Sequence, residues 1–156
     1  MSDGPPPLLS RLRERGWRLT AQRRAVVGAL RGADVHLTAD EVHRAAASVL
    51  PDVSRATIYN TLNELVSMGE VGEVVLGGRT RFDPNVTTPH HHLVCDRCGL
   101  IRDVPVADLG LGSGFGEAVT VDGAVFLPSR AELVIHGECA DRRACDRRRE
   151  SQTPSA

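Results

Sequence analysis

Before residue 70, hydrophobic residues recur at the three- and four-residue spacing of helices. The expected helices run from Leu8 to Gly16, from Thr20 to about Gly32, from Thr38 to Leu50 and from Ser54 to about Met68. Thr20, Thr38 and Ser54 are favourable N-cap residues, and Thr38 with Glu41 forms a capping box. The N-terminal half of the chain is therefore predicted to be helical.

After residue 70 the spacing of hydrophobic residues is no longer that of a helix. Two short strand-like runs, 71–76 and 79–82, are joined by Gly77-Gly78, which is typical of a β-hairpin. Consecutive helices followed by a two-stranded hairpin form the pattern of a winged helix-turn-helix. A proline-flanked break at 84–89 then precedes further strand-like runs at 91–95, 100–104 and 131–136.

The chain is thus expected to have an α+β fold with two domains. We assign residues 1–83 to the winged-helix domain, 84–88 to a hinge or linker, 89–148 to the second domain and 149–156 to a disordered, arginine-rich tail. Residues 110–116 are glycine-rich and poor helix formers.

Composition places the chain among soluble globular proteins, since 41% of its residues are hydrophobic and 25% are charged. The formal net charge is -1, so nucleic-acid binding would require a local basic cluster. Residues 1–31 supply one, with seven arginines against Asp3 and Glu14. Because the sequence has no bilayer-spanning apolar run and no signal-peptide pattern, we expect a cytoplasmic protein without a membrane partner.

The helix expected from Ser54 has an apolar face and a polar face. The apolar face holds Ile58, Leu62, Leu65 and Val66, and the polar face presents Arg55, Tyr59, Asn60 and Asn63. Such polar side chains can contact base edges in a major groove, while Ser54 and Thr57 can hold a phosphate at the helix N-terminus. The alternative is a solvated helix face, but the arginines of residues 1–31 favour DNA.

The four cysteines indicate a metal site rather than disulfides. Cys95 and Cys98 have the spacing of a zinc knuckle, and Gly99 gives its turn the necessary backbone freedom. Cys139 and Cys145 complete a set of four, although five intervening residues are more than usual. A closed four-thiolate site would be structural; the alternative is four unrelated thiols.

A histidine run, His90-His91-His92, indicates a second metal site. In a strand, His90 and His92 lie on one face, so two imidazoles converge. Candidate partners are His36, Asp83 and Asp103. Nitrogen and oxygen ligands suit Fe(II) or Mn(II) as well as Zn(II), whereas the alternative is a chance histidine run on an exposed strand.

Together these motifs resemble the ferric uptake regulator family of metal-dependent repressors over roughly residues 8–145. Residues 16–23 resemble the family's opening motif, 54–62 its recognition helix and 90–99 its metal signature. The resemblance implies a homodimer that binds a double-stranded DNA operator, with a C-terminal α/β dimerisation domain that holds structural zinc. It gives Tyr59 a base contact and places Arg18 and Arg23 in the DNA-facing opening motif.

The resemblance also implies a regulatory Fe(II) or Mn(II) at the hinge. The family's ligands fall on His36, Asp83, His90 and His92, with Asp103 as a fifth ligand in the peroxide-sensing branch. Aspartate at positions 83 and 103 favours that branch, in which peroxide oxidises the Fe(II) site at His36 and His90 and relieves repression. The alternative within the family is a repressor that senses iron or zinc supply without sensing peroxide.

Three departures from the family pattern stand out. Ala131 occupies the place of a third-site histidine, residues 109–116 replace the expected dimerisation helix, and the last two cysteines are unusually far apart.

Two other function classes are possible. A zinc hydrolase would need an open metal position and a general base, and the sequence has no HExxH pairing. A zinc-stabilised interaction module would not bind DNA, and replacing Arg55 and Tyr59 by alanine would then leave operator binding unchanged. We therefore predict that the protein is not an enzyme and has no small-molecule substrate beyond a metal ion and peroxide.

Overall fold

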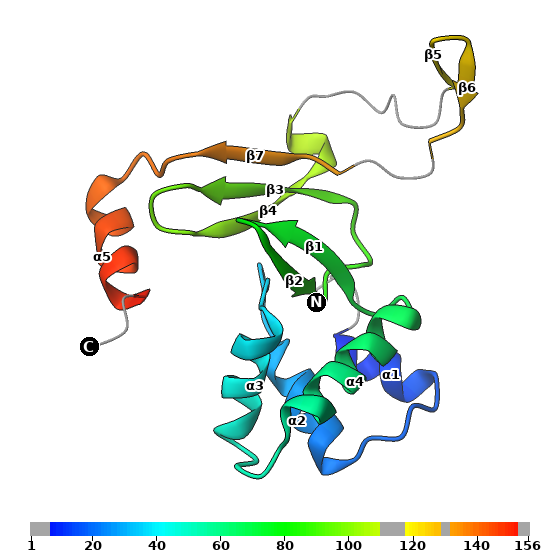
Figure 1. The fold of residues 1–156 in the computed structure, drawn as a ribbon, viewed down its shortest axis with the longest axis vertical. Coiled ribbons are helices and arrows are strands. Elements are labelled where there is room, and N and C mark those ends of the chain that lie inside the picture. Colours follow the sequence, from blue (N-terminus) through cyan, green and yellow to red (C-terminus); the bar gives the residue numbers. More distant parts are fainter. Residues whose placement is uncertain (1–6, 110–117, 129–131, 153–156) are drawn as a thin grey trace, which may run out of the picture. The chain divides into compact units, whose positions relative to one another are not determined.

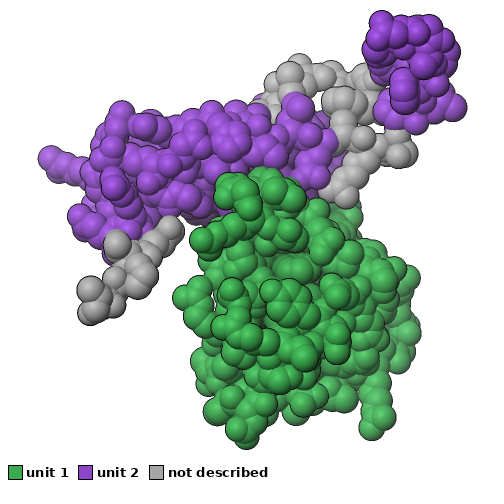
Figure 2. Space-filling model, in the orientation of Figure 1, with its two compact units in different colours: residues 1–88 green, residues 89–156 purple. Residues whose placement is uncertain are grey.

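The computed structural model describes residues 7–109, 118–128 and 132–152. The chain forms two compact units, residues 1–88 and 89–156, which Figure 2 colours separately. Within the described ranges, no helix is long and apolar enough to cross a membrane.

Unit 1 consists of helices and one hairpin. Its elements are α1 (Leu8–Glu14), α2 (Ala21–Ala29), α3 (Ala39–Ala47), α4 (Arg55–Ser67), β1 (Gly72–Leu76) and β2 (Arg79–Asp83), as Figure 1 shows. The side chains of Thr20 and Ser54 cap α2 and α4, and the complete capping box of Thr38 and Glu41 begins α3. These caps confirm the predicted helix starts.

The hairpin of unit 1 is antiparallel, with Gly72 opposite Asp83 and Leu76 opposite Arg79. Its turn residues, Gly77 and Gly78, have φ angles of 59° and 72°. Residues with side chains rarely adopt this left-handed conformation twice in succession, which is why a glycine pair stands here.

One hydrophobic core holds unit 1 together. Leu12, Val26, Val42, Ile58 and Leu62 are each fully buried at its centre. The hairpin joins the same core through Val71 and Phe82. Helices α1 to α4 and the hairpin are therefore one packed body, which is the predicted winged helix-turn-helix arrangement.

Unit 2 is built on a small mixed sheet. Its elements are β3 (His90–Cys95), β4 (Ile101–Pro105), a short 3-10 helix (Val106–Leu109), β5 (Val119–Val121), β6 (Ala124–Phe126), β7 (Val134–Gly137) and α5 (Arg142–Gln152). Strand β3 lies between β4, which is antiparallel to it, and β7, which is parallel to it. Strands β5 and β6 form a separate hairpin. Helices and sheets in both units confirm the α+β class.

Several segments differ from the sequence-based prediction. Helix α2 ends at Ala29 rather than near Gly32, β7 starts at Val134, and the β5–β6 hairpin was not predicted. Helix α3 ends at Ala47 rather than Leu50. The expected disordered tail at 149–156 is instead helical up to Gln152, because α5 begins at Arg142 and continues through the arginine-rich stretch. The glycine-rich residues 110–116 and Ala131 lie outside the described ranges.

Candidate metal centres and nucleic-acid interface

The four cysteines converge in unit 2. Their sulfur atoms all lie within 4.8 Å of one another. Cys95 Sγ is 3.7 Å from Cys145 Sγ, and Cys98 Sγ is 3.8 Å from Cys139 Sγ. A tetrahedral zinc ion with Zn–S bonds of about 2.3 Å requires sulfur separations of about 3.8 Å. The cysteine set therefore fits a zinc ion, and it includes Cys145 despite the wide spacing.

Different structural elements deliver these four sulfurs. Cys95 ends β3, and the tight turn after it brings Cys98 back, with Gly99 donating its N–H to the Cys95 carbonyl at 2.8 Å. Gly99 has a φ of 67°, the left-handed conformation expected for this turn. Cys139 follows β7, and Cys145 lies in the first turns of α5.

The thiols differ in acidity. Burial raises the pKa of Cys95, but backbone N–H groups of Cys98, Cys139 and Arg97 outweigh burial and lower it to about 6. Burial and the three neighbouring sulfurs raise the pKa of Cys145 to about 12. Four adjacent thiolates repel one another, so full ionisation of this cluster requires a bound cation.

Unit 1 contributes one pair of candidate ligands, His36 and Asp83. Leu37 and Phe82 form an isolated antiparallel bridge, with N–H···O distances of 3.3 and 2.8 Å. Because the bridge is antiparallel, the residues flanking it, His36 and Asp83, come to face each other. Their ligand atoms lie within 4.8 Å, and both side chains are buried.

Arg81 fixes the segment that carries His36. Its Nη1 atom donates to the His36 carbonyl at 2.8 Å and to Glu41 Oε2 at 3.1 Å. Glu41 is also the capping-box residue of α3. One arginine therefore joins β2, the His36 segment and the start of α3, a role that the sequence pattern did not indicate.

Unit 2 contributes the remaining nitrogen and oxygen ligands. His90 and His92 lie on the same side of β3, with ring centroids 4.8 Å apart. Asp103 is the register partner of His92 on β4, and its Oδ1 lies 3.9 Å from His90 Nε2. His92 Nδ1 is also 3.0 Å from a carboxylate oxygen of Glu132, which sequence reasoning missed. His90, His92 and Asp103 thus gather on one side of the sheet.

Helix α4 separates apolar from polar residues as the sequence predicted. Ile58, Leu62 and Leu65 are fully buried, and Thr61 is buried beside them. Arg55, Tyr59 and Asn60 are exposed, Tyr59 retaining 48% of its accessible surface. Ser54 caps the helix by accepting the Thr57 N–H at 3.1 Å. In this structure Arg55 forms an exposed ion pair with Asp40.

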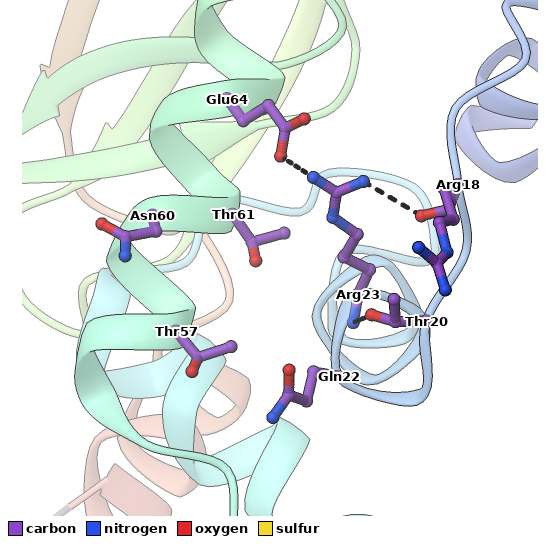
Figure 3. A pocket seen from close by; sticks show the side chains of 8 residues that line it. All are labelled: Arg18, Thr20, Gln22, Arg23, Thr57, Asn60, Thr61 and Glu64. Carbon is purple, nitrogen blue, oxygen red and sulfur yellow. Dashed lines mark hydrogen bonds and ion pairs between the residues drawn. The ribbon is translucent and has the colours of Figure 1, made fainter.

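A hollow beside α4 is lined by hydroxyl, amide and guanidinium groups and by the Glu64 carboxylate. Figure 3 shows Thr57, Thr61 and Glu64 of α4 on the side towards Thr20, Gln22 and Arg23, with Asn60 and Arg18 at opposite sides of the hollow. The lining residues outside α4 lie at and just before the start of α2, where backbone N–H groups point outward. Its hydroxyl, amide and guanidinium groups can bind a phosphate, whereas the Glu64 carboxylate pairs with Arg23.

The arginines of the N-terminal region have divided roles. Arg11 and Arg15 bind Glu70 at 2.7 and 2.9 Å. Arg23 pairs with Glu64, donates to the Arg18 carbonyl and lies 4.4 Å from the Trp17 ring centroid. Among the described residues, no carboxylate pairs with Arg18. The basic excess is therefore partly neutralised inside unit 1, and Arg18 is the arginine of the hollow that remains available to an anion.

The sequence matches the model of the ferric uptake regulator family over residues 14–110. A peroxide-responsive repressor of Staphylococcus epidermidis is 41% identical over 134 residues, which cover 85% of this chain and 86% of that relative. This chain belongs to the ferric uptake regulator family. The peroxide-responsive repressor of Staphylococcus aureus is 41% identical over 96 residues, covering 61% of this chain and 64% of that protein.

Solved structures share the fold. A zinc-bound manganese uptake regulator has a TM-score of 0.65 and 21% identity, covering 86% of this chain and 99% of the other. The Campylobacter jejuni peroxide stress regulator has a TM-score of 0.61 and 26% identity, covering 86% and 98%. The family match confirms the resemblance found in the motifs and the expectation of a regulator rather than an enzyme.

Proposed function

We propose that this protein is a metal-dependent transcriptional repressor that binds a double-stranded DNA operator as a homodimer and is released by peroxide. The observation that carries the proposal is the division of nitrogen and oxygen ligands between the units. His36 and Asp83 face each other in unit 1, and His90, His92 and Asp103 gather in unit 2.

The proposed regulatory ion, Fe(II) or Mn(II), is held by ligands of both units. A mixed set of imidazoles and carboxylates suits these ions. Bridging two units restrains the hinge at 84–88, and in a dimer the hinge sets the separation of the two α4 helices. Only a separation that matches successive major-groove faces permits both helices to bind. The metal ion favours the DNA-binding arrangement of the hinge because it binds that arrangement more tightly than the other. By the same linkage, bound DNA raises the affinity of the protein for the metal ion.

The proposed DNA surface is the exposed face of α4 with the hollow beside it. Arg55, Tyr59 and Asn60 are the side chains placed to contact bases, and Arg18 and Thr57 are those placed to contact phosphate. Asp40 competes with DNA for Arg55, so that ion pair breaks on binding. Arg23 acts by holding Arg18 and Glu64 in place.

The four-cysteine cluster is proposed to hold structural zinc. Its set of four thiolates leaves no open coordination position, and Cys95, Cys98 and Cys145 are buried. Cys95 and Cys98 come from the turn after β3, whereas Cys145 comes from α5, so the ion cross-links the sheet to the helix. Its role is to stabilise unit 2 rather than to sense a signal.

Peroxide sensing is supported by the peroxide-responsive relatives and by aspartate at positions 83 and 103. Fe(II) held by these ligands would supply the electrons that reduce peroxide. The imidazoles of His36 and His90 are the protein groups expected to gain oxygen, and an oxidised imidazole binds metal poorly. The two units then separate at the hinge and repression ends.

The experiment is a DNA-binding titration with a duplex selected from a random-sequence library by the Mn(II)-loaded protein. Zinc at the cysteines is kept constant, and the regulatory metal is absent, Mn(II) or Fe(II). After peroxide treatment, the Fe(II) form is expected to lose affinity and to show one added oxygen on peptides that contain His36 or His90. The Mn(II) form is expected to keep its affinity and its mass.

Two controls separate the steps. Arg55→Ala with Tyr59→Ala removes two of the three proposed base contacts and is expected to reduce sequence preference without changing Mn(II) affinity. Arg18→Gln removes one phosphate contact and is expected to reduce the slope of log affinity against log salt by about 1. If DNA binding depends on metal but is unchanged by peroxide in both the Fe(II) and the Mn(II) forms, the protein is instead a sensor of metal supply.

A further inference from the structure

Helix α5 has almost no apolar residues of its own. Its sequence from Arg142 to Gln152 contains only Ala144 and Cys145 as hydrophobic residues, and five of its positions are arginine. A helix of this composition needs a tertiary partner to remain ordered. The cysteine cluster is that partner, since Cys145 is fully buried among the other three sulfurs.

Polar contacts fix how α5 lies on the cluster. Arg97, inside the Cys95–Cys98 turn, donates from Nε and Nη2 to Asp146 Oδ1 at 3.0 and 2.7 Å. At the start of the helix, Asp141 Oδ1 accepts the Ala144 N–H at 3.0 Å. Arg97 thereby ties the residue after Cys145 to the knuckle turn, and Asp141 caps the N-terminus of the helix.

This placement brings Arg148 onto the sulfurs. Residues three apart share a helix face, so Arg148 follows Cys145 on the side of α5 that faces the cluster. Its Nη2 atom donates a hydrogen bond to Cys139 Sγ at 3.3 Å. Arg147, the preceding residue, is exposed. Arg148 is thus the arginine of this series that contacts the cysteine cluster.

Four thiolates around one Zn(II) carry a net charge of -2, which a guanidinium partly offsets. A cation beside an ordinary thiol promotes ionisation and so raises its reactivity. A zinc-bound thiolate is already ionised, so the same N–H···S hydrogen bonds only withdraw electron density from the sulfur. They lower its nucleophilicity and stabilise the bound state.

We propose that Arg148 protects the structural zinc site from oxidation by donating a hydrogen bond to Cys139. This inference rests on the proposed zinc site, and it gives the arginine-rich segment a function in a protein that encounters peroxide. Without the arginine, a thiolate attacks peroxide, forming an S–O bond as the O–O bond breaks and hydroxide leaves. A second thiolate attacks that sulfur, a disulfide forms, a second hydroxide leaves, and zinc loses two ligands.

The test compares the zinc-loaded full chain with Arg148→Gln, Arg148→Lys and the control Arg147→Gln, which makes the same charge change at an exposed position of the same helix. Zinc content is measured first, and zinc release under hydrogen peroxide is then followed with a chromogenic chelator. Arg148→Gln is expected to release zinc at least about tenfold faster than the wild type. This factor is the lower end of the effects seen when a metal ligand loses its hydrogen-bond partner, about tenfold. Arg147→Gln is expected to match the wild type.

A spectroscopic readout separates electronic protection from simple folding. In the Co(II)-substituted proteins, the sulfur-to-metal charge-transfer bands of Arg148→Gln and Arg148→Lys are expected at lower energy than those of the wild type and Arg147→Gln. If Arg148→Gln fails to retain zinc, the test rests on Arg148→Lys, whose charge-transfer bands in the Co(II)-substituted form are compared with those of the wild type. Unchanged bands, or zinc release at the wild-type rate in Arg148→Gln, would overturn the role of Arg148. A wild-type protein without zinc would overturn the zinc site itself.

Discussion

Replacing Arg81 by methionine tests how unit 1 holds the His36 segment. Arg81 is 19% exposed, donates to the His36 carbonyl at 2.8 Å and pairs with Glu41 at 3.1 Å. A hydrogen bond from a charged donor contributes about 1.5–3 kcal/mol. The Glu41 side chain is 33% exposed, so the ion pair adds at most about 1 kcal/mol. Methionine keeps most of the apolar stem, so we expect Arg81→Met to lower the free energy of unfolding by about 2 kcal/mol.

The assay is urea unfolding followed by the fluorescence of Trp17, the one tryptophan in the sequence, which is buried in unit 1. Arg79→Met is the control, because Arg79 lies on the same strand and is exposed, and its side chain has no hydrogen bond or ion pair within the described residues. Arg81→Met is also expected to weaken Mn(II) binding, since the backbone that carries His36 loosens. Equal unfolding free energies in Arg81→Met and Arg79→Met would refute this reasoning.

Three further predictions concern the core, the capping box and the zinc site. Leu62→Ala empties a fully buried position and is expected to cost about 3 kcal/mol in urea unfolding. Burial raises the pKa of Glu41, but hydrogen bonds from Thr38 and the charge of Arg81 outweigh burial and hold the pKa below its usual value. The resulting stability is complete above the unfolded-state pKa and is lost as pH falls through the lower folded-state pKa, so Glu41→Gln is expected to flatten the acid limb of the stability curve. Cys145→Ser is expected to lower zinc content and the helical circular dichroism signal of α5. Full zinc content in Cys145→Ser would show that Cys145 is not a zinc ligand.

The helices of unit 1 were predictable because their signals are local. Thr20, Thr38 and Ser54 cap the helices that follow them, and the spacing of Ile58, Leu62 and Leu65 gives the buried face of α4. The turn of the hairpin was equally clear from Gly77-Gly78, since few other residues adopt its backbone conformation.

Helix α5 was missed for a physical reason. Its stability comes from distant partners, namely the cysteine cluster and the Arg97–Asp146 pair, and not from an apolar stripe that periodicity detects. The same limit applies to ion pairs within unit 1. The sequence reveals that Arg11, Arg15 and Arg23 are basic, but only the fold reveals that Glu70 and Glu64 bind them.

Ligands were easier to nominate than the residues that position them. Cysteine spacing and strand alternation indicated the sulfurs and the His90–His92 pair, because the chemistry of these residue types is restrictive. Arg81, Glu132 and Arg148 contact candidate ligands from other elements. For Arg148, the one local signal is its position three residues after Cys145, on the same helix face.

The central claim is that one ion joins His36 and Asp83 of unit 1 to His90 and His92 of unit 2 and thereby controls DNA binding. Its most direct test is the affinity of the zinc-containing protein for its selected duplex with and without Mn(II), in the wild type and in His36→Ala. The account predicts that Mn(II) raises the wild-type affinity at least tenfold, about 1.4 kcal/mol, and leaves His36→Ala unchanged. Equal wild-type affinity in the two conditions, or an equal response of His36→Ala to Mn(II), would contradict it.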